Sequence, residues 1–430
     1  MINVDPGILL FILFGVLLIC NIPIAFCLIV ASLVVMTIVD VPFAMISTIM
    51  FSSVSKFTLL AVPFFIMAGI VMEKGGVSKR LIAFANACVG HISGGLAIVM
   101  VITACFFAAI SGSGPATVAA LGIILIPAMA NSGYDKAMAA ALMATCGGIG
   151  LIIPPSISYV LYGVIAEQSI GKLFMSGVIP GLVVGACLII VSLYISKKHG
   201  YGKKGKKASL AERWHAFKEA FWGLLTPVII LGGIYGGIFT PTESAAVASF
   251  YGIFVGFFVY KELTWEKLVD LMVETSTMTG MILLIIGGAS IFAWLVTTED
   301  VAIRFSEALM SISSNKFIVL LMINIIFIIA GCFLDGISIT YIFVPLMLPI
   351  LEQLHVDLVH FGIILTVNVA IGQITPPVGM NLFTACPIAN ISLNELSKAV
   401  LPFLFASIVA LIIITYIPAV SLFLPSVLGM

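Results

Sequence analysis

Two segments of this sequence interrupt apolar runs in a way that frees backbone oxygen atoms. Segments 147–156 and 372–381 each combine glycines with two consecutive prolines. A proline has no N–H group and clashes with the preceding helical turn, so a proline pair leaves carbonyl groups of that turn without helical partners. Within a membrane such carbonyls must be buried in protein or line a cavity, where they can bind a hard cation. Both segments therefore predict a broken helix that binds ions at its break.

A short polar turn precedes each break. Residues 111–115 (Ser-Gly-Ser-Gly-Pro) separate the apolar segments 94–110 and 116–130, and the turn 332–336 (Cys-Phe-Leu-Asp-Gly) is flanked in the same way. Helical limbs of about 15 residues reach only about 22 Å, which is less than the roughly 30 Å of a hydrocarbon core. The sequence predicts two re-entrant hairpins whose polar tips lie at membrane depth.

A cation site is predicted where the serine tip faces the first break. Hydroxyl and carbonyl groups would supply about five oxygens without a carboxylate, which suits Na⁺ better than Ca²⁺ or Mg²⁺. The predicted ligands of this first Na⁺ site are Ser111, Ser113, Gly150, Ile153 and Pro155.

The two breaks belong to an internal repeat. Segments 149–155 and 371–377 resemble each other at an offset of 222 residues. The same offset holds from Ala108, which aligns with Ala330, to Tyr194, which aligns with Tyr416, and its matches include glycines and prolines, which break helices. Applied to the first site, it predicts a second Na⁺ site of Phe333, Asp335, Gly372, Thr375 and Pro377. An acidic residue at membrane depth, such as Asp335, indicates a functional site. Asp335 could instead cap the helix that follows its tip.

An anionic substrate is predicted beside the ions. Half-helices that begin after each break direct their positive N-terminal ends at the cavity. No Lys or Arg lies in the tips or breaks, so amides and polar side chains would hold the anion, with Ser156, Ser338 and Asn381 as the predicted contacts. The Ser-Gly-Ser-Gly turn could also form a phosphate nest, but the chain has no Gly-Lys-Ser/Thr motif of an ATP-binding loop.

The composition predicts the environment of these elements. Of 430 residues, 62% are hydrophobic and 9% are charged, against about 25% in soluble domains. The nineteen basic residues equal the nineteen acidic ones, so the chain has no net positive charge with which to bind nucleic acid by releasing its counterions. Apolar runs near 20 residues predict an all-α polytopic protein of the lipid bilayer. The eight cysteines lie singly, and His355 and His360 do not share a helical face, so neither group predicts a metal site.

Charged loops predict the orientation. The basic stretch 197–218 is assigned to the cytoplasm. Segment 73–80 has three basic residues whereas its counterpart 297–300 is acidic, which predicts that these two loops lie on opposite sides of the membrane. The repeat is therefore predicted to be inverted, with about five spans plus one re-entrant hairpin in each copy. Both termini, Met1 and Met430, would then be periplasmic.

The predicted domains follow the repeat, with an interfacial helix near 264–275 separate from a span near 278–296. They are scaffold helices and arm of repeat 1 (1–93); transport elements of repeat 1 (94–196, with hairpin 94–131 and broken helix 136–167); a cytoplasmic linker (197–218); scaffold helices and arm of repeat 2 (219–314); transport elements of repeat 2 (315–417, with hairpin 317–352 and broken helix 357–390); and a periplasmic tail (418–430).

Segments 111–120, 147–156, 232–243 and 372–381 together resemble the large membrane subunit of tripartite ATP-independent periplasmic (TRAP) transporters. The resemblance implies a non-enzymatic, Na⁺-driven secondary transporter of the bacterial inner membrane with an elevator mechanism. It also implies a small membrane subunit of about four spans, a periplasmic substrate-binding protein, and organic acids such as C4-dicarboxylates or sialic acids as substrates. Since no such subunit precedes Met1, we expect it to be a separate chain. A stand-alone carboxylate symporter and a channel or scaffold are the alternatives.

Overall fold

The computed structural model describes residues 5–202 and 207–430, and within these ranges the regular elements are helices. In chain order they are α1 (Pro6–Ile19), α2 (Ile24–Ile38), α3 (Ala44–Val54), the 3₁₀ turn η1 (Phe57–Leu60), α4 (Ala61–Lys74), α5 (Val77–Val89), α6 (Gly95–Ser111), α7 (Gly114–Asn131), α8 (Lys136–Ile152), α9 (Ile157–Ile165), α10 (Ile170–His199), α11 (Leu210–Tyr235), α12 (Pro241–Phe254), the π-helical turn η2 (Val255–Val259), α13 (Trp265–Thr298), α14 (Val301–Ile312), α15 (Lys316–Gly331), α16 (Gly336–Gln353), α17 (Leu358–Gly372), α18 (Met380–Ala389), α19 (Leu393–Ala399), α20 (Leu401–Tyr416) and α21 (Ala419–Val427).

The helices have the length and composition of a polytopic membrane protein. Seven spans in the described ranges are long and apolar enough to cross a bilayer, or up to nine if each bent pair of helices is one span. One of these pairs is α8 with α9, which meet at 43° across the first break. The predicted all-α membrane fold class is confirmed.

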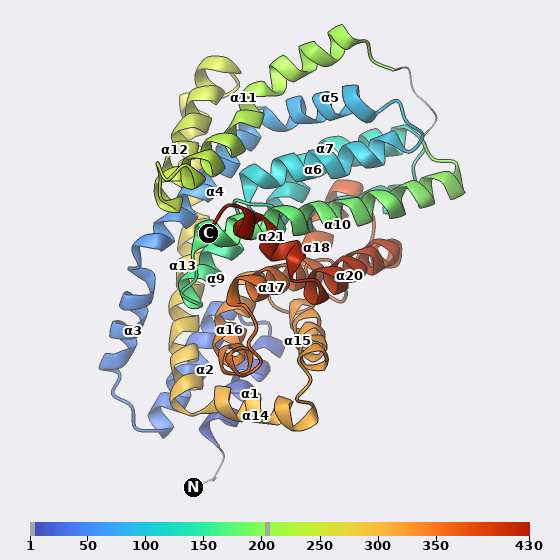
Figure 1. Cartoon of the computed structure of the whole chain (residues 1–430). Coiled ribbons are helices and arrows are strands. Elements are labelled where there is room, and N and C mark those ends of the chain that lie inside the picture. The colour runs from blue at the N-terminus through green and yellow to red at the C-terminus, as the bar shows by residue number, and fades with distance from the viewer. Residues whose placement is uncertain (1–4, 203–206) are drawn as a thin grey trace.

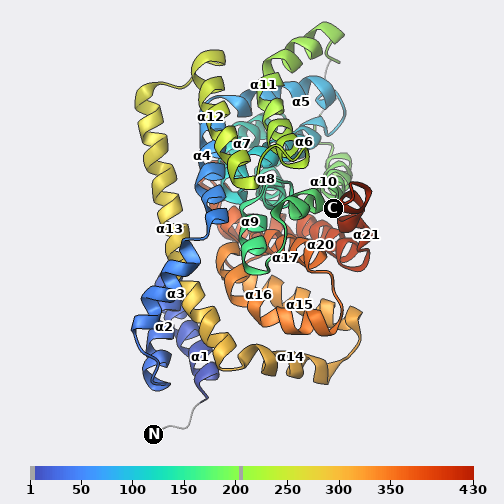
Figure 2. The ribbon, with the colours of Figure 1, turned by 60° about the vertical axis from the view of Figure 1, so that its left-hand side comes forward.

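One group of helices combines α1–α4 with α11–α13, on the left and at the top of Figure 1. Its contacts join the two halves of the chain: the Ser249 hydroxyl of α12 donates to the Phe64 carbonyl of α4 (2.7 Å), and Ser53 of α3 bonds Ser290 of α13 (2.9 Å). In Figure 2, α13 runs past α2 and α3. We call these helices the supporting group.

A second group, which we call the binding group, has the same order of elements twice. Hairpin α6–α7, broken helix α8–α9 and long helix α10 are followed later by hairpin α15–α16, broken helix α17–α18 and helix α20. A β-carbon placed on Gly148 would lie 3.3 Å from the β-carbon of Ala370, its counterpart at the offset of 222. Contact between equivalent residues is the pattern that two-fold symmetry produces.

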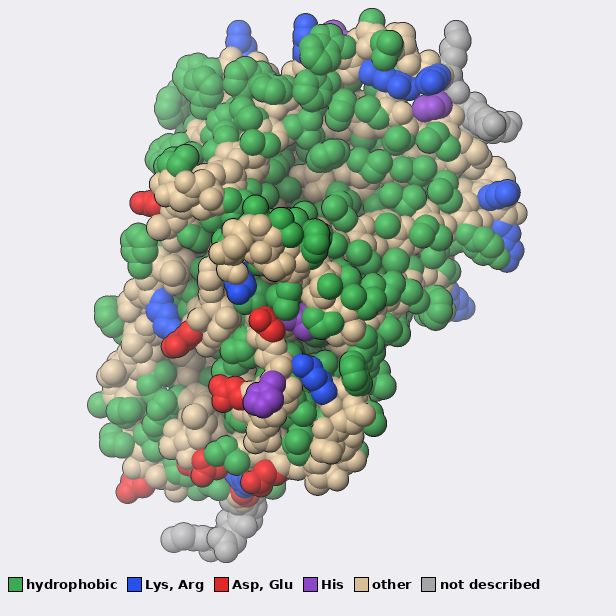
Figure 3. All heavy atoms as spheres, in the orientation of Figure 1, with side chains coloured by type: hydrophobic (Ala, Val, Ile, Leu, Met, Phe, Trp, Pro, Cys, Tyr) green, Lys and Arg blue, Asp and Glu red, His purple; other side chains and the backbone are tan. Residues whose placement is uncertain are grey.

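Two connecting helices, α5 and α14, lie at opposite ends of the molecule (Figures 1 and 2). At the start of α5, Arg80 donates to Glu262 (2.7 Å) and stacks over the Tyr260 ring at 3.8 Å. At the start of α14, Arg304 pairs with Asp5. Each connecting helix is therefore attached at its first turn to the supporting helices of the other half. Basic side chains gather at the α5 end and acidic ones at the α14 end in Figure 3.

Several predicted boundaries are wrong. The separate helices near 264–275 and 278–296 are one 34-residue helix, α13, because the charges in its first turns do not end a helix and no proline interrupts it. The linker 197–218 is shorter: α10 continues to His199, and a capping box of Ser209 and Glu212 begins α11 within it. The tail 418–430 contains α21. Residues 203–206 of the linker and Met1 lie outside the described residues.

Apart from α6, which has the 17 residues of the predicted segment 94–110, the hairpin limbs are longer than expected from the sequence. They contain 17 and 18 residues in α6–α7, and 16 and 18 in α15–α16. The turns between them lie where the sequence placed them. The first tip is buried at Ser111 and Gly112, so its polar groups face protein rather than lipid.

Candidate functional site

The tip of the first hairpin lies directly against the first break. A β-carbon placed on Gly150 would lie 2.7 Å from both the Ser113 carbonyl oxygen and the Thr117 hydroxyl. One placed on Gly112 would lie 2.9 Å from the Pro155 carbonyl oxygen. Only glycine permits this approach of two backbones. The structure thus brings together Ser113, Gly150 and Pro155 of the predicted first Na⁺ site.

Hydroxyl groups connect the two sides of this tip. The hydroxyls of Ser111 and Thr117 are 2.9 Å apart, and Thr117 donates to the Ser113 carbonyl (2.8 Å). The sequence analysis missed Thr117; its position four residues after Ser113 on α7 was the available signal. Helices α6 and α8 both end here, at Ser111 and Ile152. Because the carbonyl ends of helices are electronegative, this junction favours a cation.

The first break is shorter than the predicted 147–156. Helix α8 continues through the glycines to Ile152, since glycine weakens a helix without ending it. The chain becomes extended at Ile153 (φ −76°, ψ 126°), as expected for a residue that precedes a proline. The Ile153 side chain packs against Gly181 of α10, so only its backbone can serve as a ligand.

The second hairpin meets the second break in a similar way. A β-carbon on Gly372 would lie 2.5 Å from the Gly331 α-carbon, so the ends of α15 and α17 are in backbone contact. The Thr375 hydroxyl donates to a carbonyl one turn earlier (2.7 Å). In contrast to the buried first site, the Phe333 side chain is 53% exposed and Pro377 is exposed. Phe333 could therefore offer only its backbone to an ion.

Asp335 makes its hydrogen bonds within its own hairpin tip. Its carboxylate accepts from the Ile337 N–H (3.1 Å) and from the Ser338 hydroxyl. These are the bonds of a helix N-cap, so the capping interpretation describes the contacts of Asp335 in this structure. The predicted substrate contact Ser338 is occupied by the same cap. An anion is consequently less favoured at the start of α16 than at the first tip.

Three helix N-termini converge on the first tip. A β-carbon on Gly112 would lie 3.4 Å from the Ile157 nitrogen at the start of α9, and one on Gly114 would lie 3.0 Å from Asn381 Oδ1 at the start of α18. Helix α7 itself begins at Gly114. The N-cap residues of α7, α9 and α18 make no side-chain cap, although the Asn381 N–H of α18 donates to the Gln373 carbonyl (3.0 Å). N–H groups at helix starts that remain without partners can bind an anion without a basic side chain.

Buried polar atoms without partners line this convergence. Ser156 and Asn381, two predicted substrate contacts, are fully buried, and Ser156 Oγ and Asn381 Oδ1 have no hydrogen-bond partner among the described residues. Asn381 Nδ2 donates to the Ala144 carbonyl (3.1 Å). The sequence analysis did not assign a role to Gln373, whose Oε1 also lies unpartnered beside Gly114. Because unpaired buried acceptors are costly, these atoms indicate a ligand.

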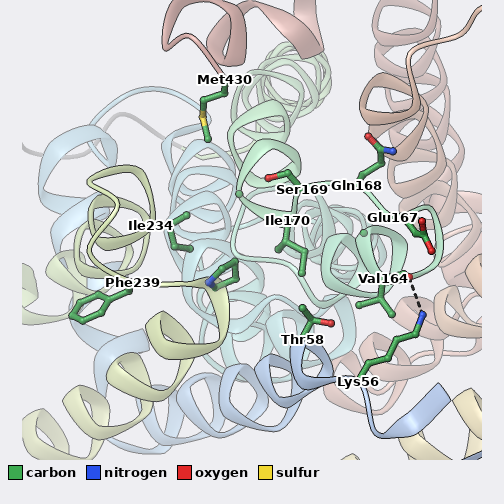
Figure 4. A pocket seen from close by; sticks show the side chains of 13 residues that line it. Lys56, Thr58, Val164, Glu167, Gln168, Ser169, Ile170, Ile234, Phe239 and Met430 are labelled. Atoms are coloured by element: carbon green, nitrogen blue, oxygen red, sulfur yellow. Dashed lines mark hydrogen bonds between the residues drawn. The ribbon is translucent and has the colours of Figure 1, made fainter. Parts of the chain in front are cut away.

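The main cavity lies elsewhere. It has a volume of about 550 Å³ and is lined by residues of η1, the α9–α10 turn, the α11–α12 turn and the C-terminus, among them Thr58, Gln168, Phe239 and Met430 (Figure 4). Lys56 donates across it to the Val164 carbonyl (3.3 Å). None of the predicted ion or substrate residues lines this cavity. It lies between parts of the supporting group and the binding group and is distinct from the hairpin tips.

Paired hairpins, broken helices and oxygen-lined junctions on a polytopic helical scaffold define a membrane transport protein. The model of the family described as "Tripartite ATP-independent periplasmic transporter, DctM component" matches residues 11–420. The chain belongs to this family, whose named relatives are permeases and not enzymes.

Three relatives illustrate the family. The isethionate TRAP transporter permease protein DctMQ of Oleidesulfovibrio alaskensis is 44% identical over 98% of this chain and 66% of its own length. The C4-dicarboxylate TRAP large permease DctM of Pseudomonas aeruginosa is 46% identical over 89% of each chain. The sialic acid TRAP permease SiaT of Haemophilus influenzae is 39% identical over 87% of this chain and 61% of its own length. The chain thus spans less than two thirds of the first and third relatives.

Two solved structures share the fold. The Alcanivorax borkumensis YdaH transporter has a TM-score of 0.66 at 14% identity and covers 96% of this chain and 98% of its own. The Neisseria gonorrhoeae MtrF structure has a TM-score of 0.60 at 13% identity and covers 96% and 95%.

Proposed function

We propose that the chain is the large permease subunit of a Na⁺-coupled secondary importer of organic acids, of the sialic acid or C4-dicarboxylate type, that receives substrate from a periplasmic binding protein. One observation carries the proposal. At the first hairpin tip, two helix C-termini meet and three helix N-termini without side-chain caps adjoin them. The C-terminal carbonyls favour a cation and the N-terminal N–H groups favour an anion, so the two can bind as neighbours.

Sodium occupies the two junctions in this proposal. At the first, the carbonyls of Ser113, Gly150 and Pro155 and the hydroxyls of Ser111 and Thr117 supply neutral oxygens. At the second junction, the backbones around Gly331 and Gly372 supply neutral oxygens, and Thr375 adds a hydroxyl. Neutral oxygens without a carboxylate in direct contact suit a monovalent ion.

The anion is an organic acid. The relatives described above are named for isethionate, C4-dicarboxylates and sialic acid, all of which carry an acidic group. No Lys or Arg occurs in segments 111–120, 147–157 or 372–381, so helix N-termini and side chains such as Ser156 and Asn381 hold the acid. Binding of Na⁺ at the neighbouring junction would strengthen this attraction in a water-excluded site.

Transport follows from relative movement of the two groups of helices. The contact between the equivalent residues Gly148 and Ala370 supports a two-fold relation between the repeats. In this proposal the binding group moves as one body past the supporting group. The basic end that carries α5 would be cytoplasmic. Glu299 and Met430 would lie on the periplasmic side, where the binding protein delivers substrate. A small membrane subunit of about four spans would complete the permease.

Reconstituted uptake tests the proposal. We expect uptake of an acid to require an inward Na⁺ gradient and the substrate-loaded binding protein. Uptake without the binding protein would instead identify a stand-alone symporter. Unchanged uptake in Na⁺-free buffer with a proton gradient would refute Na⁺ coupling and redirect attention to Asp335 as a proton carrier.

A further inference from the structure

Asn381 presents a fixed acceptor to the space beside the first hairpin tip. Its Nδ2 donates to the Ala144 carbonyl (3.1 Å), which determines the orientation of the amide. Rotation of the amide by 180° would place Oδ1 against that carbonyl and lose the bond. The remaining atom, Oδ1, is buried and unpartnered, and it lies 3.0 Å from a β-carbon placed on Gly114.

A second acceptor lies next to the first. Gln373 Oε1 is also buried, has no partner among the described residues, and lies beside the same face of Gly114. A β-carbon on Gly114 would lie 2.4 Å from Gln373 Oε1 and 3.0 Å from Asn381 Oδ1, so both oxygens pack against this glycine. They lie where the first hairpin tip meets the end of α17 and the start of α18. Each would lose free energy on burial unless something donates to it.

The local electrostatics distinguish a hydroxyl donor from a cation. Gly114 is the first residue of α7 and Asn381 is the second residue of α18, so two positive helix ends lie here, whereas Gln373 follows the last residue of α17, whose carbonyl end is negative. The dipoles of α7 and α18 would oppose a cation beside Asn381. A neutral hydroxyl can donate its proton to an amide oxygen while an adjacent acidic group accepts from the helix N–H groups.

We propose that Asn381 and Gln373 read a hydroxyl group next to the acidic group of the substrate, so that the chain prefers hydroxylated organic acids over isosteres that lack the hydroxyl. The inference rests on the proposed function and assigns the substrate class of the same site. It also fits the named relatives in part: isethionate and sialic acid carry hydroxyl groups, whereas an unsubstituted C4-dicarboxylate does not.

Two pairs of acids that differ by one hydroxyl test the inference: isethionate against ethanesulfonate, and malate against succinate. The full chain in lipid nanodiscs would be titrated with each acid in the presence of Na⁺, with thermal unfolding as the readout of binding. This measurement needs no binding protein, whose own specificity would mask that of the membrane chain. We expect the hydroxylated member of at least one pair to bind about 10-fold more tightly, the effect of one net hydrogen bond to a buried group.

The variants Asn381→Leu and Gln373→Leu remove one acceptor each at similar volume. Each variant should reduce the preference for the hydroxylated acid to about twofold or less. If Asn381→Leu folds poorly, Gln373→Leu still tests the inference, because it leaves the hydrogen bond from Asn381 to α8 in place. The exposed amide variant Gln353→Leu, at the end of α16, is the matched control and should keep the full preference.

The outcomes separate this inference from the proposed function. Equal binding of both members of each pair to the unmodified chain would overturn the hydroxyl inference and leave the organic-acid importer intact. Binding of none of the acids with Na⁺ present would overturn the proposed function itself. Loss of Na⁺-induced stabilisation in Asn381→Leu, without any hydroxyl preference in the parent chain, would assign the two oxygens to an ion and also reject the inference.

Discussion

The variant Gly372→Ala tests whether the close backbone contact at the second break is needed for ion binding. The new β-carbon would lie 2.5 Å from the Gly331 α-carbon and 3.0 Å from its carbonyl oxygen. Carbon atoms in contact are about 3.5–4.0 Å apart, so the ends of α15 and α17 would have to separate by about 1 Å. Gly331 and Gly372 are both buried, and their backbone atoms cannot rotate away as a flexible side chain can.

The separation should appear in Na⁺ binding. Overpacking of this kind costs about 1–3 kcal/mol, and the strain is relieved only when the carbonyl groups of the two helix ends move apart. At about 1.4 kcal/mol per tenfold change in affinity, we expect the Na⁺ concentration for half-maximal uptake to rise about 10-fold or more. Uptake into proteoliposomes across a series of Na⁺ concentrations measures this, and thermal unfolding measures the stability of the variant.

The control variant is Gly232→Ala in α11, where a β-carbon would meet no atom within 4 Å. It should leave Na⁺ dependence unchanged and stabilise the helix by up to about 1 kcal/mol. If Gly372→Ala also shows Na⁺ dependence within twofold of the parent chain, the junction of α15 and α17 is not an ion site and the reasoning is refuted.

Three further predictions concern other parts of the molecule. Thr117→Val removes the hydroxyl between Ser111 and Ser113 and should weaken Na⁺ activation of uptake several-fold at nearly constant unfolding temperature; an unchanged Na⁺ curve would exclude this hydroxyl as a ligand. Burial alone would raise the pKa of Glu262, but the hydrogen bond and charge of Arg80, with a smaller contribution from Lys79, outweigh it and lower the pKa below the usual 4.5. The resulting stabilisation, about 0.5 kcal/mol for a partly buried surface pair, is complete above pH 4.5 and is lost as the pH falls through the lowered value. Glu262→Gln should remove this pH dependence of unfolding between pH 7 and 3. Cysteines at Lys56 and Gln168, joined across the cavity by a bifunctional reagent, should stop uptake but preserve Na⁺-induced stabilisation; full uptake with the crosslink formed would argue against movement of the binding group.

The sequence alone determined the features that depend on local backbone chemistry. Proline pairs place both helix breaks wherever the rest of the chain folds, because a proline cannot continue the hydrogen-bond pattern of the preceding turn. The hairpin turns at 111–115 and 332–336 are also local, although α7 and α16 begin within them rather than after them. Apolar composition was sufficient for the membrane fold class.

The tertiary structure decided which of these local features meet. Gly114 and Asn381 are far apart in the sequence, and only folding brings the first hairpin tip against the half-helix of the other repeat. The offset of 222 placed equivalent residues at the second junction, but it could not decide whether Asp335 binds an ion or caps its own helix, and it gave no sign that Thr117 and Gln373 would line the first tip. A repeat conserves the path of the backbone, whereas the direction of each side chain depends on neighbours from distant segments. The polar environment of the sites is therefore a property of the packed molecule.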